Sequence, residues 1–516
     1  MADEPAPKRK KKGDGLGKRT THAMTWTAAG AIVSNALRLV MLAVLGRLLA
    51  PEDFGVVAAA MTVILFVGLL RDFGLGLALV QRPELEREHV EVAFTITALQ
   101  GVILTGLVAL AAGPIADFFE MPHATSLVRA LSLLFLLRSL SIVPNFMLQR
   151  EMQFRALTII DVVGYIAGSI TSVTLAYLGN GPWALVWGYC VETLVNTAQL
   201  FAAYRTPIGL KFHRRHFREL LGFGIGKTVS QVGNYFATQG DYMVIGRMLP
   251  KTDLGLYQRA YELVRFPATV FTTVAGKVLF SAFSKVQDDP ERMGRVLRRS
   301  TFGSAIVLMP ASAGLIVLAP EVIHLLLGGK WSGAIWPFRI MAASMMFRTT
   351  YKLGAMVGRS AGEVMTIAKW QWFYAAAVVG GAAVSVYWGI LGVACTTSLA
   401  ITLQFCSMYR IGLKMTNLRA RDIVAAFVSP VVFSLAVGGV TWVTAEVLRN
   451  AGASYLIVAA VATVTGSATF LVLVLGGIRR GHGDWGWLKE TLLDVVGKRR
   501  KKQRKQKLDA AANESL

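Results

Sequence analysis

The sequence predicts an all-α polytopic membrane protein with about 14 transmembrane helices, arranged as two six-helix lobes related by a parallel repeat and followed by two C-terminal helices. Of its 516 residues, 54% are hydrophobic and only 16% are charged, and the mean hydropathy is +0.51. Apolar runs of roughly 20 residues recur from Met24 to Gly477, each long enough to cross about 30 Å of hydrocarbon as a helix. A segment that is repeated 200 residues further along the chain divides these runs into two halves.

Proline, glycine and charged residues interrupt the apolar runs and set the expected ends of the helices. The first lobe is expected to contain six spans, at residues 24–50, 54–81, 90–113, 124–148, 156–178 and 182–204. The second lobe repeats this number, at residues 220–249, 254–283, 297–319, 333–357, 364–387 and 389–411. Two further spans follow, at residues 422–446 and 452–477. The connection at residues 387–389 is very short, so the sequence defines the division between the eleventh and twelfth spans less well than the other divisions.

The expected organisation is therefore linear along the chain. It comprises a basic tail (1–23), an N-lobe (24–204), a basic linker (205–219), a C-lobe (220–411), two extra spans (412–477) and a second basic tail (478–516). The longest polar connections hold only about 15 residues, too few to bury the core of a soluble domain.

The net charge of +23 follows from the membrane topology, and we do not expect nucleic-acid binding. With a cytoplasmic N-terminus, the inner loops and their edges carry about 19 Lys and Arg residues and the outer loops about three. Both basic tails then face the cytoplasm and anionic membrane lipid. The scattered cysteines Cys190, Cys395 and Cys406 favour buried thiols over a disulfide framework or a metal site.

The repeat pairs VLGRLLAPEDFGV (residues 44–56) with VIGRMLPKTDLGL (residues 244–256), and six of the thirteen positions are identical. Arg47 and Asp53 in the first copy correspond to Arg247 and Asp253 in the second. Six spans separate the copies, so both have the same orientation and are related by an axis along the membrane normal, as in some secondary transporters. For the individual residues, the simpler interpretation is an Arg–Asp contact that ties the turn at a helix end.

Charged residues deep inside the spans are the strongest functional signal. Each costs about 2.5–3.5 kcal/mol in mid-membrane, so it normally faces a cavity or a partner. The arginines of this kind are Arg38, Arg71, Arg138, Arg265 and Arg348. They predict a cationic cavity for an anionic cargo, although interhelix salt bridges would also explain them. Carboxylates that could couple transport to an ion or pair with an arginine are Asp72, Asp241 and Glu262; Glu192, Arg259, Lys227 and Lys277 lie closer to span ends.

No enzyme motif is found. GFGIGKT (residues 222–228) lacks the glycine that a phosphate-binding loop requires five positions before its Gly-Lys pair. The sequence also lacks a paired His/Glu metal motif and a nucleophile elbow. We therefore expect a transporter without catalytic residues, metal or cofactor.

Several segments resemble the Wzx-type polysaccharide flippases of the multidrug/oligosaccharidyl-lipid/polysaccharide (MOP) superfamily, in the branch of exopolysaccharide and colanic-acid flippases. They occur in the order of that family over about 290 residues. They are PEDFGVV (51–57), RDFGLGLALVQR (71–82), NFMLQREMQF (145–154), LGLYQRAYELVRFP (254–267), KVLFSAFSKVQDDPER (277–292) and LLLGGKWSGAIWP (325–337).

This resemblance implies export of oligosaccharide repeat units linked to undecaprenyl-type pyrophosphate across a bacterial inner membrane, for exopolysaccharide or lipopolysaccharide biosynthesis. A polysaccharide polymerase and assembly proteins are the implied partners. In the similar lipid II flippases, arginines on the first, second and eighth spans line the cavity, and Arg38, Arg71 and Arg265 lie on these spans here. Two alternatives stay open: an organic-ion exporter of the same fold, and a membrane glycosyltransferase or polymerase of the same pathway.

Overall fold

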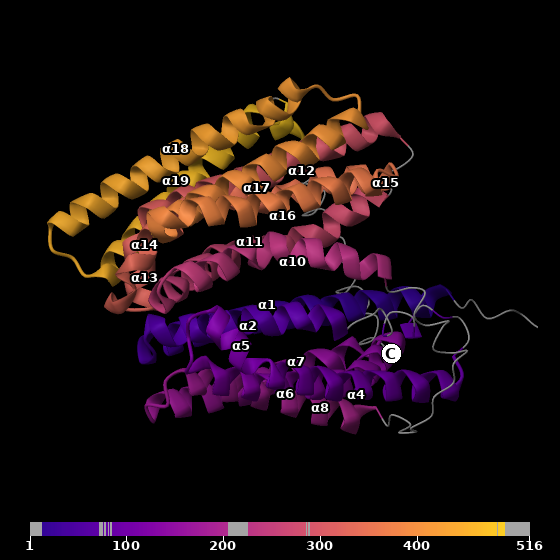
Figure 1. Cartoon of the computed structure of the whole chain (residues 1–516). Helices are drawn as coiled ribbons and strands as arrows, with labels where there is room; N and C mark the ends of the chain where they lie inside the picture. The colour runs from indigo at the N-terminus through magenta and orange to yellow at the C-terminus, as the bar shows by residue number, and fades with distance from the viewer. Residues whose placement is uncertain are drawn as a thin grey trace, which may run out of the picture.

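The computed structural model describes residues 13–71, 76, 79–80, 82, 85–204, 225–284, 286, 289–481 and 483–490. Within these residues all regular structure is α-helix or short 3-10 helix. The helices run roughly side by side in two bodies, which are drawn in indigo to purple and in magenta to yellow (Figure 1). The order of the colours shows that each body is a continuous half of the chain, as the two-lobed prediction requires.

The described part of the N-terminal body contains six long helices and one short one. They are α1 (Gly13–Leu48), α2 (Pro51–Arg71), α4 (Arg87–Leu110), α5 (Ala112–Phe118), α6 (Ala124–Arg150), α7 (Phe154–Tyr177) and α8 (Pro182–Ala203). The C-terminal body contains α10 (Ile225–Met248), α11 (Lys251–Ser284), α12 (Pro290–Val317), α13 (Ala319–Leu326), η1 (Gly329–Ala334), α14 (Ile335–Ala343), α15 (Met345–Ser360), α16 (Val364–Ser385), η2 (Val386–Trp388), α17 (Gly389–Lys414), α18 (Ala420–Asn450) and α19 (Tyr455–Arg480). Helices α2, α10 and α11 form most of the contact between the bodies.

Within the described residues, each predicted span lies largely in helix, and the tenth is divided in two. The break lies at Ser344, between α14 and α15, where the side-chain hydroxyl donates to the carbonyl of Met341 at 2.9 Å. A serine hydroxyl that bonds the preceding turn competes with the helical backbone pattern. Among the described residues, eight segments are long and apolar enough to cross a membrane, one of which joins α16 to α17. The chain is a multi-pass membrane protein.

Sequence signals explain the helix boundaries that position the bodies. Asp289 precedes α12 and its carboxylate accepts from the amide of Arg292 at 3.0 Å, with Pro290 at the first helical position. The hairpin between α16 and α17 turns at Gly389, whose φ of 68° favours glycine. The tight turn at residues 387–389 is therefore possible without strain.

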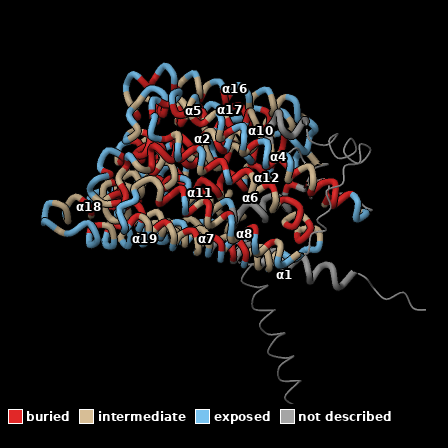
Figure 2. The backbone as a smooth tube through the Cα atoms, turned by 60° about the horizontal axis from the view of Figure 1, so that its bottom comes forward, coloured by how far each residue is buried: buried red, intermediate tan, exposed pale blue. Residues whose placement is uncertain are grey.

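The outward faces of the helices are apolar. Figure 2 shows buried residues concentrated along the interior and exposed residues on the outside of the helices. On the last two helices the exposed residues include Leu435, which is 72% exposed, and Val464, which is 67% exposed. Such surfaces would aggregate in water, but they fit the hydrocarbon of a bilayer.

Glycines allow α7 and α8 to pack in direct contact. A Cβ atom at Gly168 would lie 2.6 Å from the carbonyl oxygen of Gly188, and one at Gly188 would lie 1.8 Å from Oγ of Ser172. Small residues at such a crossing let the two backbones approach closely. This contact holds α8, which carries Glu192, against α7, which carries Tyr165.

Gly168→Leu is expected to lower the stability of the protein by about 1–3 kcal/mol, because the new side chain meets backbone that cannot move aside. Gly106→Leu is a matched control on α4, since a Cβ atom there meets nothing within 4 Å. The melting temperatures of the purified proteins in detergent measure the difference. Equal melting of the two variants would contradict the close α7–α8 contact.

The extra helices belong to the C-terminal body. Helix α18 packs mainly against α12, and α19 packs against α18 and α13. The residue bounds predicted for the lobes are not tested by this packing and stay a prediction. Most of the linker and of both tails lies outside the described residues.

Candidate functional site

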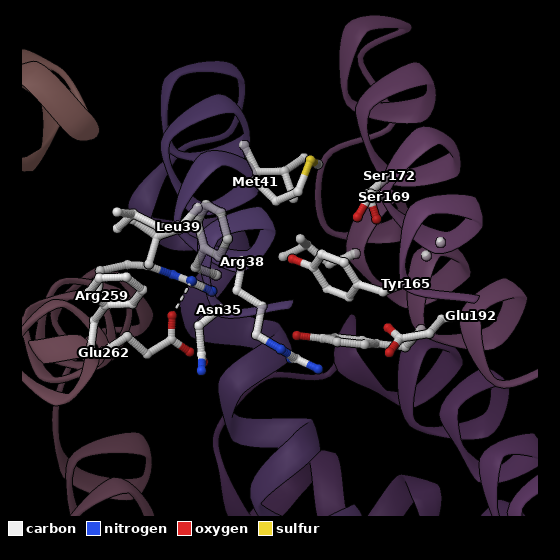
Figure 3. A pocket seen from close by; sticks show the side chains of 18 of the residues that line it. Asn35, Arg38, Leu39, Met41, Tyr165, Ser169, Ser172, Glu192, Arg259 and Glu262 are labelled. Atoms are coloured by element: carbon white, nitrogen blue, oxygen red, sulfur yellow. Dashed lines mark hydrogen bonds and ion pairs between the residues drawn. The ribbon is translucent and has the colours of Figure 1, made fainter. Parts of the chain in front are cut away.

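A large cavity lies between the two bodies, among α1, α7, α8 and α11, and has a volume of about 420 Å³. Arg38 on α1 and Arg265 on α11 both line it and are both exposed. The structure thus brings together one predicted arginine from each half of the chain. Figure 3 shows Arg38 pointing across the cavity toward Glu192 on α8.

A third arginine in this cavity is already paired. Arg259 on α11 forms an ion pair with Glu262 one turn further along, and its guanidinium carbon lies 4.0 Å from the ring centroid of Phe54. Glu262, predicted as a coupling or pairing carboxylate, therefore has an arginine partner inside the cavity. Arg38 instead lies 4.8 Å over the ring of Tyr165 on α7, a cation–π contact that leaves its hydrogen-bond donors for a ligand.

A second cavity of about 200 Å³ adjoins the first, since Phe54, Arg259 and Arg265 line both. Glu262 lines both cavities as well. The uncharged polar groups of the second cavity come from α2, α8, α10 and α11, and they are Thr62, Tyr189, Gln239, Tyr242, Gln258 and Tyr261. The side-chain oxygen of Gln258 is buried and has no hydrogen-bond partner. Together the two cavities form a polar space. Three arginines and two carboxylates, Glu192 and Glu262, line the first cavity, here called the cationic side, and the uncharged groups of the second cavity are here called the neutral side.

Arg71 and Arg138 do not join this space. They line a separate cavity of about 230 Å³ between α2, α6 and α10, together with Gln231. The five arginines predicted to face a cationic cavity are therefore not all gathered in one cavity. Arginines on neighbouring spans face different cavities because the rotation of each helix is set by its packing, which their spacing in sequence does not reveal.

Arg348 is held inside the C-terminal body. Its Nη1 donates to the hydroxyl of Tyr261 at 2.9 Å. Asp241 is also buried, accepts from the hydroxyl of Tyr257 at 2.7 Å, and lies close enough to Arg348 for their charges to attract. Tyr257 shares a further hydrogen bond with Thr397 at 3.1 Å. These residues form a buried network next to the polar space, and Arg348 does not line any of the three cavities.

The repeat arginines do not contact the repeat aspartates. Arg47 donates to the carbonyl of Leu325 at 2.6 Å, and Arg247 pairs with Glu120 at 2.5 Å. Asp53 accepts from the amide of Ala50 at 2.9 Å and so caps α2. The residue three positions before Asp253 is proline, which has no N–H to donate. The two arginines therefore contact other elements, and the expected Arg–Asp contact across each turn is not formed.

Asp72, Lys227 and Lys277 cannot be placed, because Asp72 and the side chains of the two lysines lie outside the described residues. Sequence reasoning gave little weight to Glu192 and Arg259, although a charge inside a predicted span marked both. Tyr165 and Asn35 also line the large cavity. No sequence signal singled them out, because uncharged polar residues are common in membrane helices. Within the described ranges, no cluster of His, Cys, Asp or Glu could hold a metal ion.

Comparison with known proteins decides the family. Residues 44–336 match the family described as "Polysaccharide biosynthesis protein". The chain belongs to this family. The matched range contains Arg265 and both copies of the repeat, and Arg38 lies six residues before it. It ends inside α14, so it leaves out the last five long helices of this polysaccharide biosynthesis protein.

Curated relatives share most of the chain's length. It is 29% identical to the succinoglycan biosynthesis transport protein ExoT of Rhizobium meliloti (strain 1021), over 71% of this chain and 74% of the relative. It is 26% identical to the lipopolysaccharide biosynthesis protein WzxC of Escherichia coli (strain K12), over 65% of this chain and 68% of the relative. These relatives confirm the sequence resemblance to Wzx-type proteins.

Solved transporters share the fold. The lipid II flippase MurJ in an inward closed conformation matches with a TM-score of 0.71, at 14% identity, over 88% of this chain and 98% of that one. An inward-facing multidrug resistance MATE family transporter of the MOP superfamily matches with a TM-score of 0.61, at 15% identity, over 77% of this chain and 98% of that one. The predicted two-lobed, all-α MOP fold is therefore confirmed.

Proposed function

We propose that this protein is a flippase that moves lipid-linked oligosaccharide repeat units across the bacterial inner membrane for exopolysaccharide or lipopolysaccharide biosynthesis. The observation that carries the proposal is the pair Arg38 and Arg265, one from each body, exposed in one cavity. The family supports it, as do relatives named as a transport protein of succinoglycan biosynthesis and a probable glycan biosynthesis flippase. No covalent chemistry is required, so we propose a transporter and not an enzyme.

The cationic side of the polar space suits the pyrophosphate of an undecaprenyl-type carrier. Guanidinium groups form bidentate, charge-assisted hydrogen bonds with phosphate oxygens. Arg259 pairs with Glu262, and Glu192 lies across the cavity from Arg38, so the three arginines exceed the carboxylates of the lining by one charge. Arg38 and Arg265 are the arginines that we propose bind the ligand. An organic cation would meet this excess positive charge, which makes a cation exporter the weaker alternative despite the shared fold.

The neutral side of the polar space suits the sugars. The amides of Gln239 and Gln258 and the hydroxyls of Tyr242 and Tyr261 can hydrogen-bond with sugar hydroxyls, and tyrosine rings also offer apolar faces. Gln258 has a buried oxygen that a donor from the ligand would satisfy. The lipid chain would stay in the bilayer beside α1.

Transport would proceed by alternating access, with the N-lobe (24–204) rocking against the C-lobe (220–411). In this proposal the basic tails (1–23 and 478–516) and the linker (205–219) face the cytoplasm, while residues 412–477 extend the C-lobe. Asp241 is the best-placed candidate for ion coupling, because it is buried beside hydroxyl groups, whereas Glu262 is occupied by Arg259. A polymerase and assembly proteins would use the exported units outside.

The decisive experiment is lipid analysis of a strain that lacks this protein but keeps its glycosyltransferases. The proposal expects one complete lipid-linked repeat unit to accumulate in the inner leaflet, identified by mass spectrometry. Unpolymerised units in the outer leaflet would instead identify a polymerase. No change in any lipid-linked sugar would favour drug export.

A further inference from the structure

The two copies of the repeat meet at one end of the molecule, where α1 and α10 end and α2 and α11 begin, here called the outer end. A Cβ atom at Gly55 would lie 1.7 Å from the carbonyl oxygen of Lys251, and one at Gly255 would lie 1.9 Å from the carbonyl oxygen of Pro51. The first turns of α2 and α11 therefore touch backbone to backbone, each through the glycine that the repeat retains. Glu52 and Lys251 add an ion pair of 2.5 Å between the same two turns.

Each copy also contacts the segment that follows the short helix of the opposite body. At the end of α10, Arg247 pairs with Glu120, and a Cβ atom at Gly246 would lie 3.0 Å from the ring of Phe119. These two partners directly follow α5. The Gly-Arg pair of the second copy is thus held by the N-terminal body.

The first copy makes the corresponding contacts in the other direction. At the end of α1, Arg47 donates to the carbonyl of Leu325, and a Cβ atom at Gly46 would lie 2.6 Å from the side chain of Leu327. These partners lie at the end of α13, which follows the third long helix of its body as α5 does in the other. The two sets of contacts are therefore reciprocal: each repeat copy contacts the opposite body near the end of that body's short helix.

Trp331 completes the outer end. It is fully buried, its Nε1 donates to the carbonyl of Gly46 at 2.7 Å, and its ring lies 5.3 Å from that of Phe54. Phe54 in turn lines the large cavity and lies under the guanidinium of Arg259. Trp331 thus gives a structural role to the GGKW segment and connects the outer end to the wall of the cavity.

We propose that these contacts form an outer latch, which the two repeat copies build together and which must separate for the cavity to open at this end. The latch consists of the Gly55–Gly255 crossing, the pairs Arg247–Glu120 and Lys251–Glu52, and the contacts of Arg47 and Trp331. The proposal rests on alternating access between the two bodies. Its ion pairs are largely exposed and therefore weak one by one, so the latch can close the outer end without making opening rare.

The first test bridges the latch. Glu52→Cys and Lys251→Cys place one thiol on each body, in a background in which the three native cysteines are replaced by serine. A short membrane-permeant bis-thiol reagent joins them in cells, and mass spectrometry of the purified protein verifies the bridge. Bridging is expected to stop export, which the unbridged double variant retains. Normal export by the bridged protein would show that the two bodies need not separate at this point during transport, and it would overturn the latch.

The second test needs no cargo, so it separates failure of the latch from failure of the proposed function. Spin labels at Leu178→Cys and Tyr387→Cys, both exposed residues in different bodies, report the distance between the outer ends by electron resonance. Arg247→Glu is expected to raise the ratio of long to short distances about two- to fivefold, the scale of one exposed ion pair. Adding Glu120→Arg restores the pair and should restore the distances.

A matched control is Arg295→Glu, which breaks the exposed pair with Glu291 inside α12 and should leave the distances unchanged. If Arg247→Glu also leaves them unchanged, or if Glu120→Arg fails to restore them, the pair does not hold the outer ends together. Either result would overturn its place in the latch.

Discussion

Export of the lipid-linked oligosaccharide is expected to stop when Arg38 and Arg265 are both replaced by glutamine, while the protein stays at its normal level in the membrane. Each charge-assisted hydrogen bond contributes about 1.5–3 kcal/mol, so losing both lowers headgroup capture about a hundredfold or more. Both side chains are exposed in the cavity, so their removal leaves the packed core intact. Arg38→Lys keeps the charge but loses the bidentate geometry, and we expect reduced export.

Arg129→Gln is the matched control, because this exposed arginine on α6 lines none of the three cavities. It should export normally. Export is measured as the polysaccharide formed, and abundance as the protein in the membrane fraction. Normal export by the variant that combines Arg38→Gln with Arg265→Gln would refute the cationic cavity.

The second large effect concerns stability. Arg449→Met is expected to destabilise the protein by about 3–5 kcal/mol, because it leaves the carboxylate of Glu321 buried without its partner. Glu321 is fully buried, and Nε and Nη2 of Arg449 donate to its two oxygens, both at 2.8 Å. The same Nη2 also donates to the carbonyl of Val317 at 3.1 Å. Thermal unfolding of the purified protein measures the loss.

Two further variants separate the buried charge from other effects of the substitution. Arg421→Met removes an exposed arginine from the start of the same helix, and its melting temperature should match that of the original protein. Adding Glu321→Leu to Arg449→Met removes the unpaired carboxylate, and we expect most of the stability to return. A single Arg449→Met variant as stable as the original protein would contradict this account of the ion pair.

The sequence was sufficient to predict the all-α two-lobed fold and the family, both of which are confirmed. A run of roughly 20 apolar residues leaves a membrane helix almost no alternative, because every backbone group must be satisfied inside the bilayer. The short elements were missed. Helix α13 has eight residues and η1 has six, so they lie between two predicted spans without a periodic pattern of their own. The break at Ser344 was also missed, since serine is tolerated inside helices.

The candidate site was predictable only in part. The free-energy cost of placing a charged side chain inside the membrane marks Arg38 and Arg265 as residues that need a polar environment. Both do line a cavity. The same cost applies to Arg348, which hydrogen-bonds to Tyr261 instead. Insertion cost depends on depth alone, whereas a partner depends on which face of the helix a residue occupies and on which helix packs there. Only the three-dimensional arrangement separates a cavity residue from a buried network.

Among the described residues, α18 and α19 pack mainly on helices of the C-terminal body, so the two moving parts differ in size. A bilayer resists rotation of a wide body more than that of a narrow one. Equal and opposite torques at the contact between the bodies would then turn the N-terminal body through the larger angle, while the C-terminal body stays closer to the membrane frame. Viscous drag by the lipid, and not the symmetry of the repeat, would decide which half of this protein swings.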